Sequence, residues 1–191
     1  TTQYGDAIQR AEFWNTGGSN PGYHVLLDQP TIMPTVTINV PANQGQVVID
    51  PSTGARTALV EGSWFYAEQL KLMASMQIDP HVVAIFLTYN TFLYYGDTSN
   101  CCTLGWHGAT IDSAAPDVAN IRPGTKGNGV QKVNTYIFAS YSDPGLFTIA
   151  SDSIQDINAL SHEVSEFLND PFTNNVVPAW FVPNSFYGCT P

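Results

Sequence analysis

The residues whose chemistry stands out are His162, Glu163 and Glu166, which lie close together in the last third of the sequence. If this stretch is helical, His162 and Glu166 are one turn apart and project from the same face, with Glu163 beside them. An imidazole and a carboxylate at this spacing can hold Zn²⁺, and a neighbouring carboxylate can take a proton from water that the metal activates. The spacing indicates metal-assisted hydrolysis, with His162 and Glu166 as ligands and Glu163 as the general base.

The segment that must position these residues, 153–169, has the strongest helical pattern in the sequence. Its apolar residues recur at helical spacing and predict one buried stripe, made of Ile154, Ile157, Leu160, Val164, Phe167 and Leu168. Ser153 is the expected N-cap, and Pro171 is expected to end the helix. His162 and Glu166 fall outside the stripe. The helix can therefore bury one side and present both residues to a cleft.

The rest of the chain predicts strands and two further helices. Helices are expected at 6–14 and at 63–76, the second capped by Ser63. Residues 96–129 contain many glycines and prolines and predict loops. A continuous apolar run at 82–89 is typical of a central strand. Other β-rich segments are expected at 23–27, 35–40, 46–49, 91–95 and 133–141. Strands followed by one strong late helix indicate an α+β domain with a twisted, mainly antiparallel sheet and a few helices.

The segment around His162 resembles the zincin metallopeptidases, whose helix carries His-Glu-x-x-His. Glu166 departs from that motif, because it stands where the second histidine belongs. The wider string from Leu160 to Phe172 resembles a group of secreted microbial proteins of the form Ser-His-Glu-x-x-Glu-x-x-x-Asp-Pro, distantly similar to the plant Exordium-type extracellular proteins. The resemblance implies a zincin-like fold, one zinc ion and a single peptidase-like domain over residues 1–191.

Catalytic zinc normally has three protein ligands and one open position, so a third ligand has to be assigned. In the microbial group an acidic residue follows a cysteine downstream, and an acid beyond Pro191 is the first candidate, which would leave the domain incomplete at its C-terminus. His107, between Gly105 and Gly108, is the second candidate. Asp170 is the third, because it lies roughly 12 Å from His162 along a straight helix.

The three cysteines bear on the compartment. Cys101 and Cys102 are adjacent, and Cys189 lies near the end of the chain. Because adjacent cysteines rarely bond to each other, Cys189 is expected to pair with one of them, and the choice between the two stays open. Low charge and abundant Thr, Asn and Tyr favour an extracellular location. The start at Thr1 is interpreted as a processed N-terminus.

The charge balance argues against several classes of partner. Sixteen acidic residues against six basic ones give a net charge of −10, which repels phosphate backbones and anionic lipid. No Gly-x-Ser-x-Gly or phosphate-binding motif is present. The main prediction is a secreted zinc-dependent peptidase acting on peptide or protein substrates. The alternative is a non-catalytic extracellular structural or binding protein that keeps the fold and associates with itself or with a C-terminal partner segment.

Overall fold

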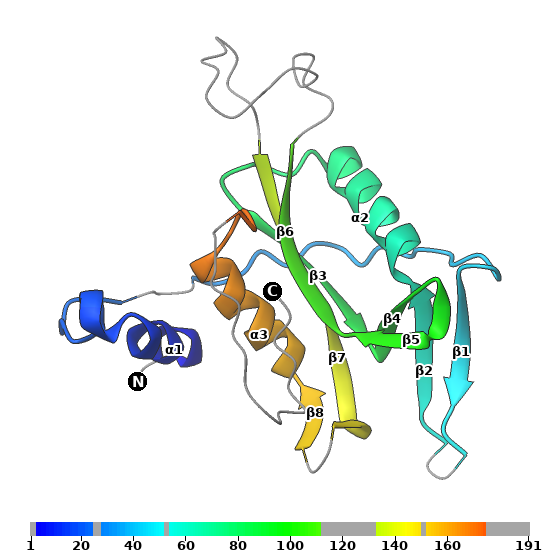
Figure 1. Cartoon of the computed structure of the whole chain (residues 1–191). Coiled ribbons are helices and arrows are strands. Elements are labelled where there is room, and N and C mark those ends of the chain that lie inside the picture. Colours follow the sequence, from blue (N-terminus) through cyan, green and yellow to red (C-terminus); the bar gives the residue numbers. More distant parts are fainter. Residues whose placement is uncertain (1–2, 25–27, 52–53, 112–132, 150–151, 175–191) are drawn as a thin grey trace.

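The computed structural model describes the chain at residues 3–24, 28–51, 54–111, 133–149 and 152–174 (Figure 1). These residues form three α-helices, one short π-helical turn and eight strands arranged in two sheets. The expected α+β class is therefore confirmed. The expected single sheet is instead two sheets, each of which mixes parallel and antiparallel pairs.

The first sheet has the strand order β1-β2-β4-β5. Its strands are β1 (Gly45–Ile49), β2 (Arg56–Glu61), β4 (Thr91–Tyr95) and β5 (Asp97–Thr103). β2 and β4 are parallel, and the two outer pairs are antiparallel. The predicted strands at 46–49 and 91–95 are confirmed, whereas β2 and β5 were not predicted.

The second sheet carries the residues of interest and has the order β3-β7-β6, with β8 also paired to β7. Its strands are β3 (Val83–Tyr89), β6 (Gly105–Ile111), β7 (Val133–Ile149) and β8 (Asp152–Asp156). The run at 82–89 is a strand as predicted, but among the described residues it lies at the end of the sheet and β7 is central. The prediction of loops at 96–129 is wrong for the residues that form β5 and β6. Residues 112–129 lie outside the described residues.

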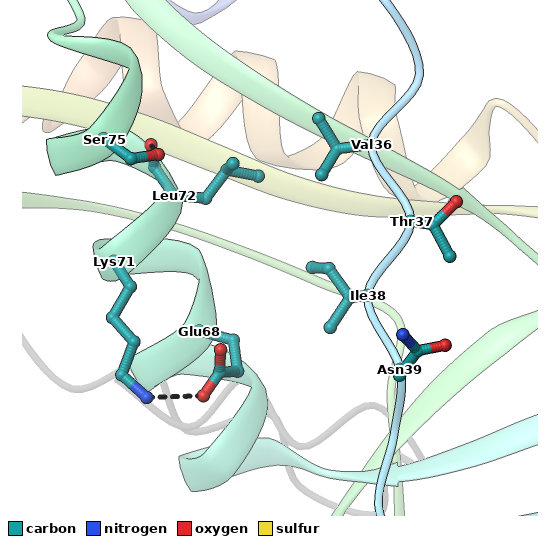
Figure 2. A pocket seen from close by; sticks show the side chains of 8 residues that line it. All are labelled: Val36, Thr37, Ile38, Asn39, Glu68, Lys71, Leu72 and Ser75. Atoms are coloured by element: carbon teal, nitrogen blue, oxygen red, sulfur yellow. Dashed lines mark hydrogen bonds and ion pairs between the residues drawn. The ribbon is translucent and has the colours of Figure 1, made fainter.

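Two other predicted strands are not found. Residues 35–40 are extended but belong to no strand; they run beside α2 (Gly62–Met76), with Val36 and Ile38 pointing toward the helix and Thr37 pointing away (Figure 2). Of the segment 23–27, residues 25–27 lie outside the described residues and the first two are not in a strand. Alternating side chains alone do not make a strand, because the backbone must also find a partner.

The helices begin at different residues from those predicted. α1 covers Tyr4–Glu12 and is followed by the π-helical turn Trp14–Gly18. α2 is capped by Glu61 rather than Ser63, since the Glu61 side chain accepts a hydrogen bond from the backbone N–H of Trp64 at 2.7 Å.

The third helix, α3 (Asn158–Asn169), starts five residues later than predicted. Ser153 is not its cap but part of β8, which pairs with β7. Ladder pairing with β7 has overridden the local helical pattern, and Ile157 from the predicted stripe is 54% exposed. The helix ends just before Pro171, as predicted.

The two faces of the second sheet are covered by different helices. On one face, Phe65 of α2 packs against Phe138 of β7 and Trp106 of β6, with ring centroids 4.9 and 6.1 Å apart. These rings join the main core with Val60 and Leu93. On the other face, α3 packs across β6 and β7 (Figure 1). The sheet therefore separates an aromatic core from the surface that carries α3.

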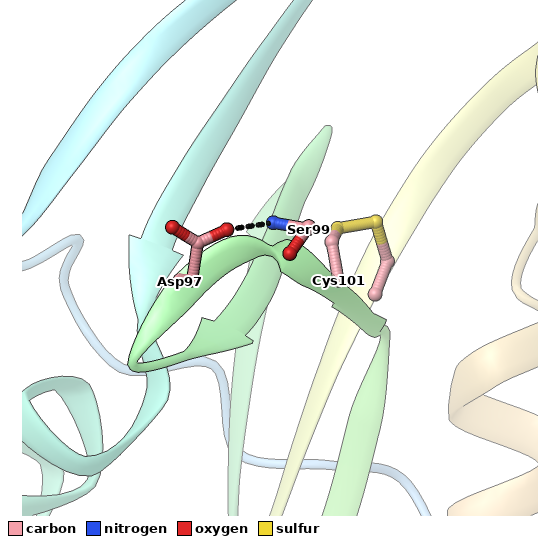
Figure 3. Close-up of a disulfide and its surroundings, with 4 residues drawn as sticks. Asp97, Ser99 and Cys101 are labelled. Carbon is pink, nitrogen blue, oxygen red and sulfur yellow. Dashed lines mark hydrogen bonds between the residues drawn. A yellow bond between two sulfur atoms is a disulfide. The ribbon is translucent and has the colours of Figure 1, made fainter.

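A disulfide joins Cys101 to Cys102 in β5 (Figure 3). This bond differs from the expected one, in which Cys189 pairs with either Cys101 or Cys102; the Cα atoms of the two bonded cysteines lie 3.0 Å apart. The predicted partner, Cys189, lies outside the described residues. Nearby, the Ser99 backbone N–H donates to Asp97 at 2.8 Å and shapes the turn that opens this strand.

Candidate metal centre

Four of the five residues singled out from the sequence form one continuous chain of contacts between α3 and β6. His162 Nε2 lies 3.0 Å from Glu166 Oε1. The other oxygen of that carboxylate, Oε2, lies 3.4 Å from His107 Nδ1. The same His107 nitrogen lies 3.3 Å from Glu163 Oε2. We call these four residues the metal cluster.

Strand and helix geometry together produce this arrangement. In β6, side chains alternate between faces, so His107 points toward α3 while Trp106 points toward the aromatic core. Glu163 and Glu166 are three residues apart on α3 and can therefore reach the same neighbour. Gly105 allows the close approach of the helix, because a Cβ atom there would lie 2.6 Å from Glu163 Cγ. The cluster needs a small residue two positions before the histidine.

The metal cluster is closed on the side of the sheet and open on the side of solvent. The side chains of Glu163 and His107 are 8% and 12% exposed. Those of Glu166 and His162 are 49% and 62% exposed. The second ring nitrogen of His107, Nε2, is buried and has no hydrogen-bond partner among the described residues. A ligand held by these groups would be anchored from the inside and reached from the outside.

Electrostatics within the cluster follow from its mixture of imidazoles and carboxylates. Hydrogen bonds to Glu163 and then Glu166 raise the pKa of His107 to about 9. Hydrogen bonds from His107 and then His162 lower the pKa of Glu166 to about 2. The hydrogen bond to Glu166 also raises the pKa of His162. Without a metal, a proton on His107 therefore holds the two carboxylates together.

Three residues of the cluster have the donor types and the spacing to hold a metal ion. One atom each from His107, Glu163 and Glu166 lie within 4.8 Å of one another. Imidazole nitrogen and carboxylate oxygen are both zinc donors, at about 2.0–2.2 Å from the ion. Ligands at that distance in a tetrahedron are roughly 3.4 Å apart, close to the 3.3 and 3.4 Å separations around His107 Nδ1.

Asp170, the remaining candidate ligand, is not part of the cluster. It follows the last residue of α3, where its backbone N–H donates to the Glu166 carbonyl at 2.7 Å. Its carboxylate accepts from the Asn174 backbone N–H at 3.1 Å. These contacts belong to the end of the helix. The candidate acid beyond Pro191 is outside the chain.

Two residues of α1 that the sequence analysis did not single out are hydrogen-bonded to α3. Gln9 of α1 is 1% exposed, and its side-chain amide donates to the Ser165 carbonyl at 3.4 Å. Glu12 accepts from the Asn169 side chain at 2.7 Å. The helical pattern of α1 is polar enough to be mistaken for a surface helix, and no local signal marks Gln9 as buried.

A separate shallow groove lies between α2 and the extended segment beside it (Figure 2). It is lined mainly by aliphatic and small polar side chains, and it includes none of the metal cluster. Its one charged pair is Lys71 with Glu68, whose Nζ and Oε1 atoms are 2.6 Å apart.

Comparison with known proteins gives no relative: no family model, no curated protein and no solved structure matches the chain. Among the described residues, no helix has both the length and the apolar character needed to cross a membrane.

Proposed function

We propose that this protein is a zinc-dependent peptidase with a zincin-like fold, built as a single domain. In this proposal His107, His162 and Glu166 hold the metal, and Glu163 is the proton acceptor. One observation carries the proposal, namely the chain of contacts His162–Glu166–His107–Glu163, closed at one end and open to solvent at the other. Two imidazoles and a glutamate are a donor set used by catalytic zinc in peptidases.

The ligand roles follow from position. Glu166 is central, because each of its oxygens already faces one of the two histidines. His107 takes the place of the third ligand that the helix motif lacks. His162 lies outside the tight group around His107, but it is exposed on one side and has room to turn toward the other ligands. Its exposed side leaves space for a substrate.

Glu163 is suited to move a proton. A zinc ion bound here would polarise the peptide carbonyl and lower the pKa of the attacking water. Once His107 has lost its Nδ1 proton, it no longer donates to Glu163, and Glu163 Oε2 is free to accept one. With a metal bound, Glu163 would be placed to accept a proton from the attacking water and to return it to the leaving amine. Packing against Gly105 holds the carboxylate in place during both transfers.

We also propose an extracellular location with peptide or protein substrates. The Cys101–Cys102 disulfide and the small number of charged residues both support a protein that works in an oxidising compartment.

A second candidate is a non-catalytic extracellular binding or structural protein. The burial of Glu163 favours this second candidate. Its side chain is 8% exposed and lies beside His107, so it could itself bind the ion. Four protein ligands would then close the coordination sphere, which is typical of structural zinc.

The first experiment is elemental analysis of the purified protein, of Glu166→Ala and of Glu68→Ala as a matched control. Glu68 is also a helical glutamate near a basic partner, but it lies on α2. We expect about one zinc per chain in the native protein and the control, and none in Glu166→Ala. No metal in the native protein after incubation with zinc would overturn the proposal.

Glu163→Gln then separates the two candidates. The peptidase proposal predicts that this variant keeps its zinc and loses hydrolysis of a casein-type protein substrate. Loss of zinc would instead identify Glu163 as a ligand and support the closed structural site.

A further inference from the structure

A second cluster of aromatic and acidic side chains lies at the end of β3 and beside it on β7, next to the irregularity in β7 that follows Ser142. The rings of Tyr89 and Tyr141 are stacked, with centroids 6.0 Å apart and planes inclined by 22°. Each phenol is hydrogen-bonded to an aspartate: Tyr89 to Asp143 at 2.5 Å, and Tyr141 to Asp156. We call these four residues the tyrosine–aspartate surface.

The backbone holds this surface in place from both sides. Asn90 donates through its side-chain amide to Asp143 Oδ2 at 2.9 Å and accepts from the Asp143 backbone N–H at 2.9 Å. Asn90 is 5% exposed and adopts a left-handed conformation, with φ of 47°. The irregular part of β7 after Ser142 is therefore fixed against the end of β3, and the Asp143 carboxylate is positioned before any ligand arrives.

The tyrosine–aspartate surface still has an acceptor atom and an exposed aromatic residue with which to bind a ligand. Both hydrogen bonds to the Asp143 side chain use Oδ2, so Oδ1 accepts none from the described residues. These bonds lower the pKa of Asp143, which keeps it ionised at neutral pH. Tyr89 beside it is 62% exposed. An aromatic face next to a free carboxylate oxygen attracts an organic cation.

We propose that the tyrosine–aspartate surface binds the guanidinium group of an arginine side chain in a peptide. A guanidinium is planar and can lie flat on the Tyr89 ring while it donates to Asp143, whereas an ammonium is a compact charge that cannot stack in this way. A metal cation fits less well, because the two rings supply no ligand and Asp143 Oδ2 is already occupied by donors. The net charge of −10 favours approach of a basic peptide over an acidic one.

This surface lies on the same face of the sheet as the metal cluster. His107 is paired with Ile137, and Tyr141 lies four residues further along β7 on the same side. The separation along the strand is about 13 Å, which an extended peptide spans in roughly four residues. The binding proposal does not rest on the metal.

The test uses the zinc-free protein, prepared with EDTA, and three blocked pentapeptides, Ac-Ala-Ala-Xaa-Ala-Ala-NH₂, with Arg, Lys or Gln at the central position. Calorimetric titration measures binding alone, so neither metal content nor turnover enters. We expect the Arg peptide to bind at least about tenfold more tightly than the Gln peptide, with the Lys peptide between them. Equal affinity of the Arg and Gln peptides would overturn the proposal.

Variants assign the binding to this surface. Tyr89→Leu and Asp143→Asn should each weaken the Arg peptide about tenfold, while Tyr89→Phe, which keeps the ring, should retain most of the affinity. Asp97→Asn is the control, since Asp97 is an exposed acid on β5 of the other sheet. Thermal unfolding checks that each variant is folded. Arg binding that survives both Tyr89→Leu and Asp143→Asn would contradict the proposal, even if the protein proves to be a zinc peptidase.

Discussion

The two faces of the sheet β3-β7-β6 differ in chemistry although they share the same strands. Trp106 and Phe138 face α2, where they form an aromatic core with ring centroids 5.1 Å apart. His107, the next residue in β6, faces α3, where it meets two carboxylates. One strand therefore supplies both a core residue and a candidate metal ligand.

The face toward α2 mainly stabilises the fold, whereas the face toward α3 carries the groups of the candidate site. Burial of large aromatic rings supplies much of the free energy of folding, at roughly 25 cal/mol per Å². Charged groups brought together on the α3 side oppose burial unless they are paired. We expect substitutions on the α2 side to change the free energy of unfolding, and those on the α3 side to change metal binding.

The largest expected effect is on the α2 side. Phe138 is fully buried, and Phe138→Ala should lower the free energy of unfolding by about 3–5 kcal/mol. Urea denaturation of the zinc-free protein measures this loss. The fraction that remains folded should still bind zinc stoichiometrically. Loss of zinc from the folded fraction would break the division between the two faces.

The two glycines of β6 sharpen the comparison, because they point to opposite faces. In Gly105→Ala the new Cβ would lie 2.6 Å from Glu163 Cγ, so the carboxylate must move. We expect zinc affinity to fall about 10–100-fold, as for residues that position metal ligands. Competition with a chromophoric chelator measures the affinity.

Gly108→Ala is the matched variant on the aromatic side. Its Cβ would lie 2.7 Å from the Tyr136 hydroxyl, which is buried and hydrogen-bonded to Tyr66 at 3.0 Å. We expect the free energy of unfolding to fall by about 1–3 kcal/mol through overpacking, with zinc affinity unchanged. If both alanines weakened zinc equally, the two faces would be coupled rather than independent.

A smaller effect is expected from pH on the metal-free protein. The pKa of His107 is raised to about 9, so its contribution to stability is complete below about pH 6.5 and is lost as the pH rises through about 9. The pKa of Glu166 is lowered to about 2, so its contribution is present above about pH 4.5 and is lost as the pH falls through about 2. Urea denaturation across this range should show both losses.

His107→Gln is the variant that tests the assignment, and it should remove the part of the alkaline loss that occurs near pH 9, since the pKa of His162 is also raised and makes its own contribution. Phe138→Ala should lower the whole profile without changing its shape, because it lies on the other face. If His107→Gln lost stability at alkaline pH as the native protein does, a group other than His107 would be responsible for that loss.

The smallest expected effect concerns the start of α2. Glu61→Ala should lower the free energy of unfolding by about 1 kcal/mol, because the Trp64 backbone N–H loses its acceptor. Ser63→Ala, at the cap expected from the sequence, should change it by less than about 0.5 kcal/mol. Neither should alter zinc binding. Equal losses in the two variants would contradict the observed cap.

Prediction from the sequence was most accurate for features that depend on a single helix or strand. The i, i+4 relation of His162 and Glu166 is set by the helix alone, and the structure places the two side chains in contact. The continuous apolar run at 82–89 and the alternating segment at 133–141 both lie in strands, as predicted. Helical pattern failed at Ser153, where pairing with β7 converts the first turn of the predicted helix into a strand.

The sequence could not predict what depends on contacts between distant segments. His107 and Glu163 are 56 residues apart, and only the position of α3 over β6 brings them together. The burial of the Glu163 side chain was not predicted for the same reason, since it depends on Gly105 in β6. The one local signal was a histidine flanked by small residues, Gly105-Trp106-His107-Gly108. That pattern permits a close approach but does not identify the partner.

The alternation of Trp106 and His107 also limits how the gene can change. A deletion of one codon between Cys102 and Trp106 that shifted β6 by one position against β7 would exchange the two faces. The imidazole would enter the aromatic core, and the indole would displace the carboxylates of α3. Insertions and deletions in this part of the chain should therefore be selected against far more strongly than single substitutions. Where homologues differ in length, β6 should keep its spacing to the preceding strand.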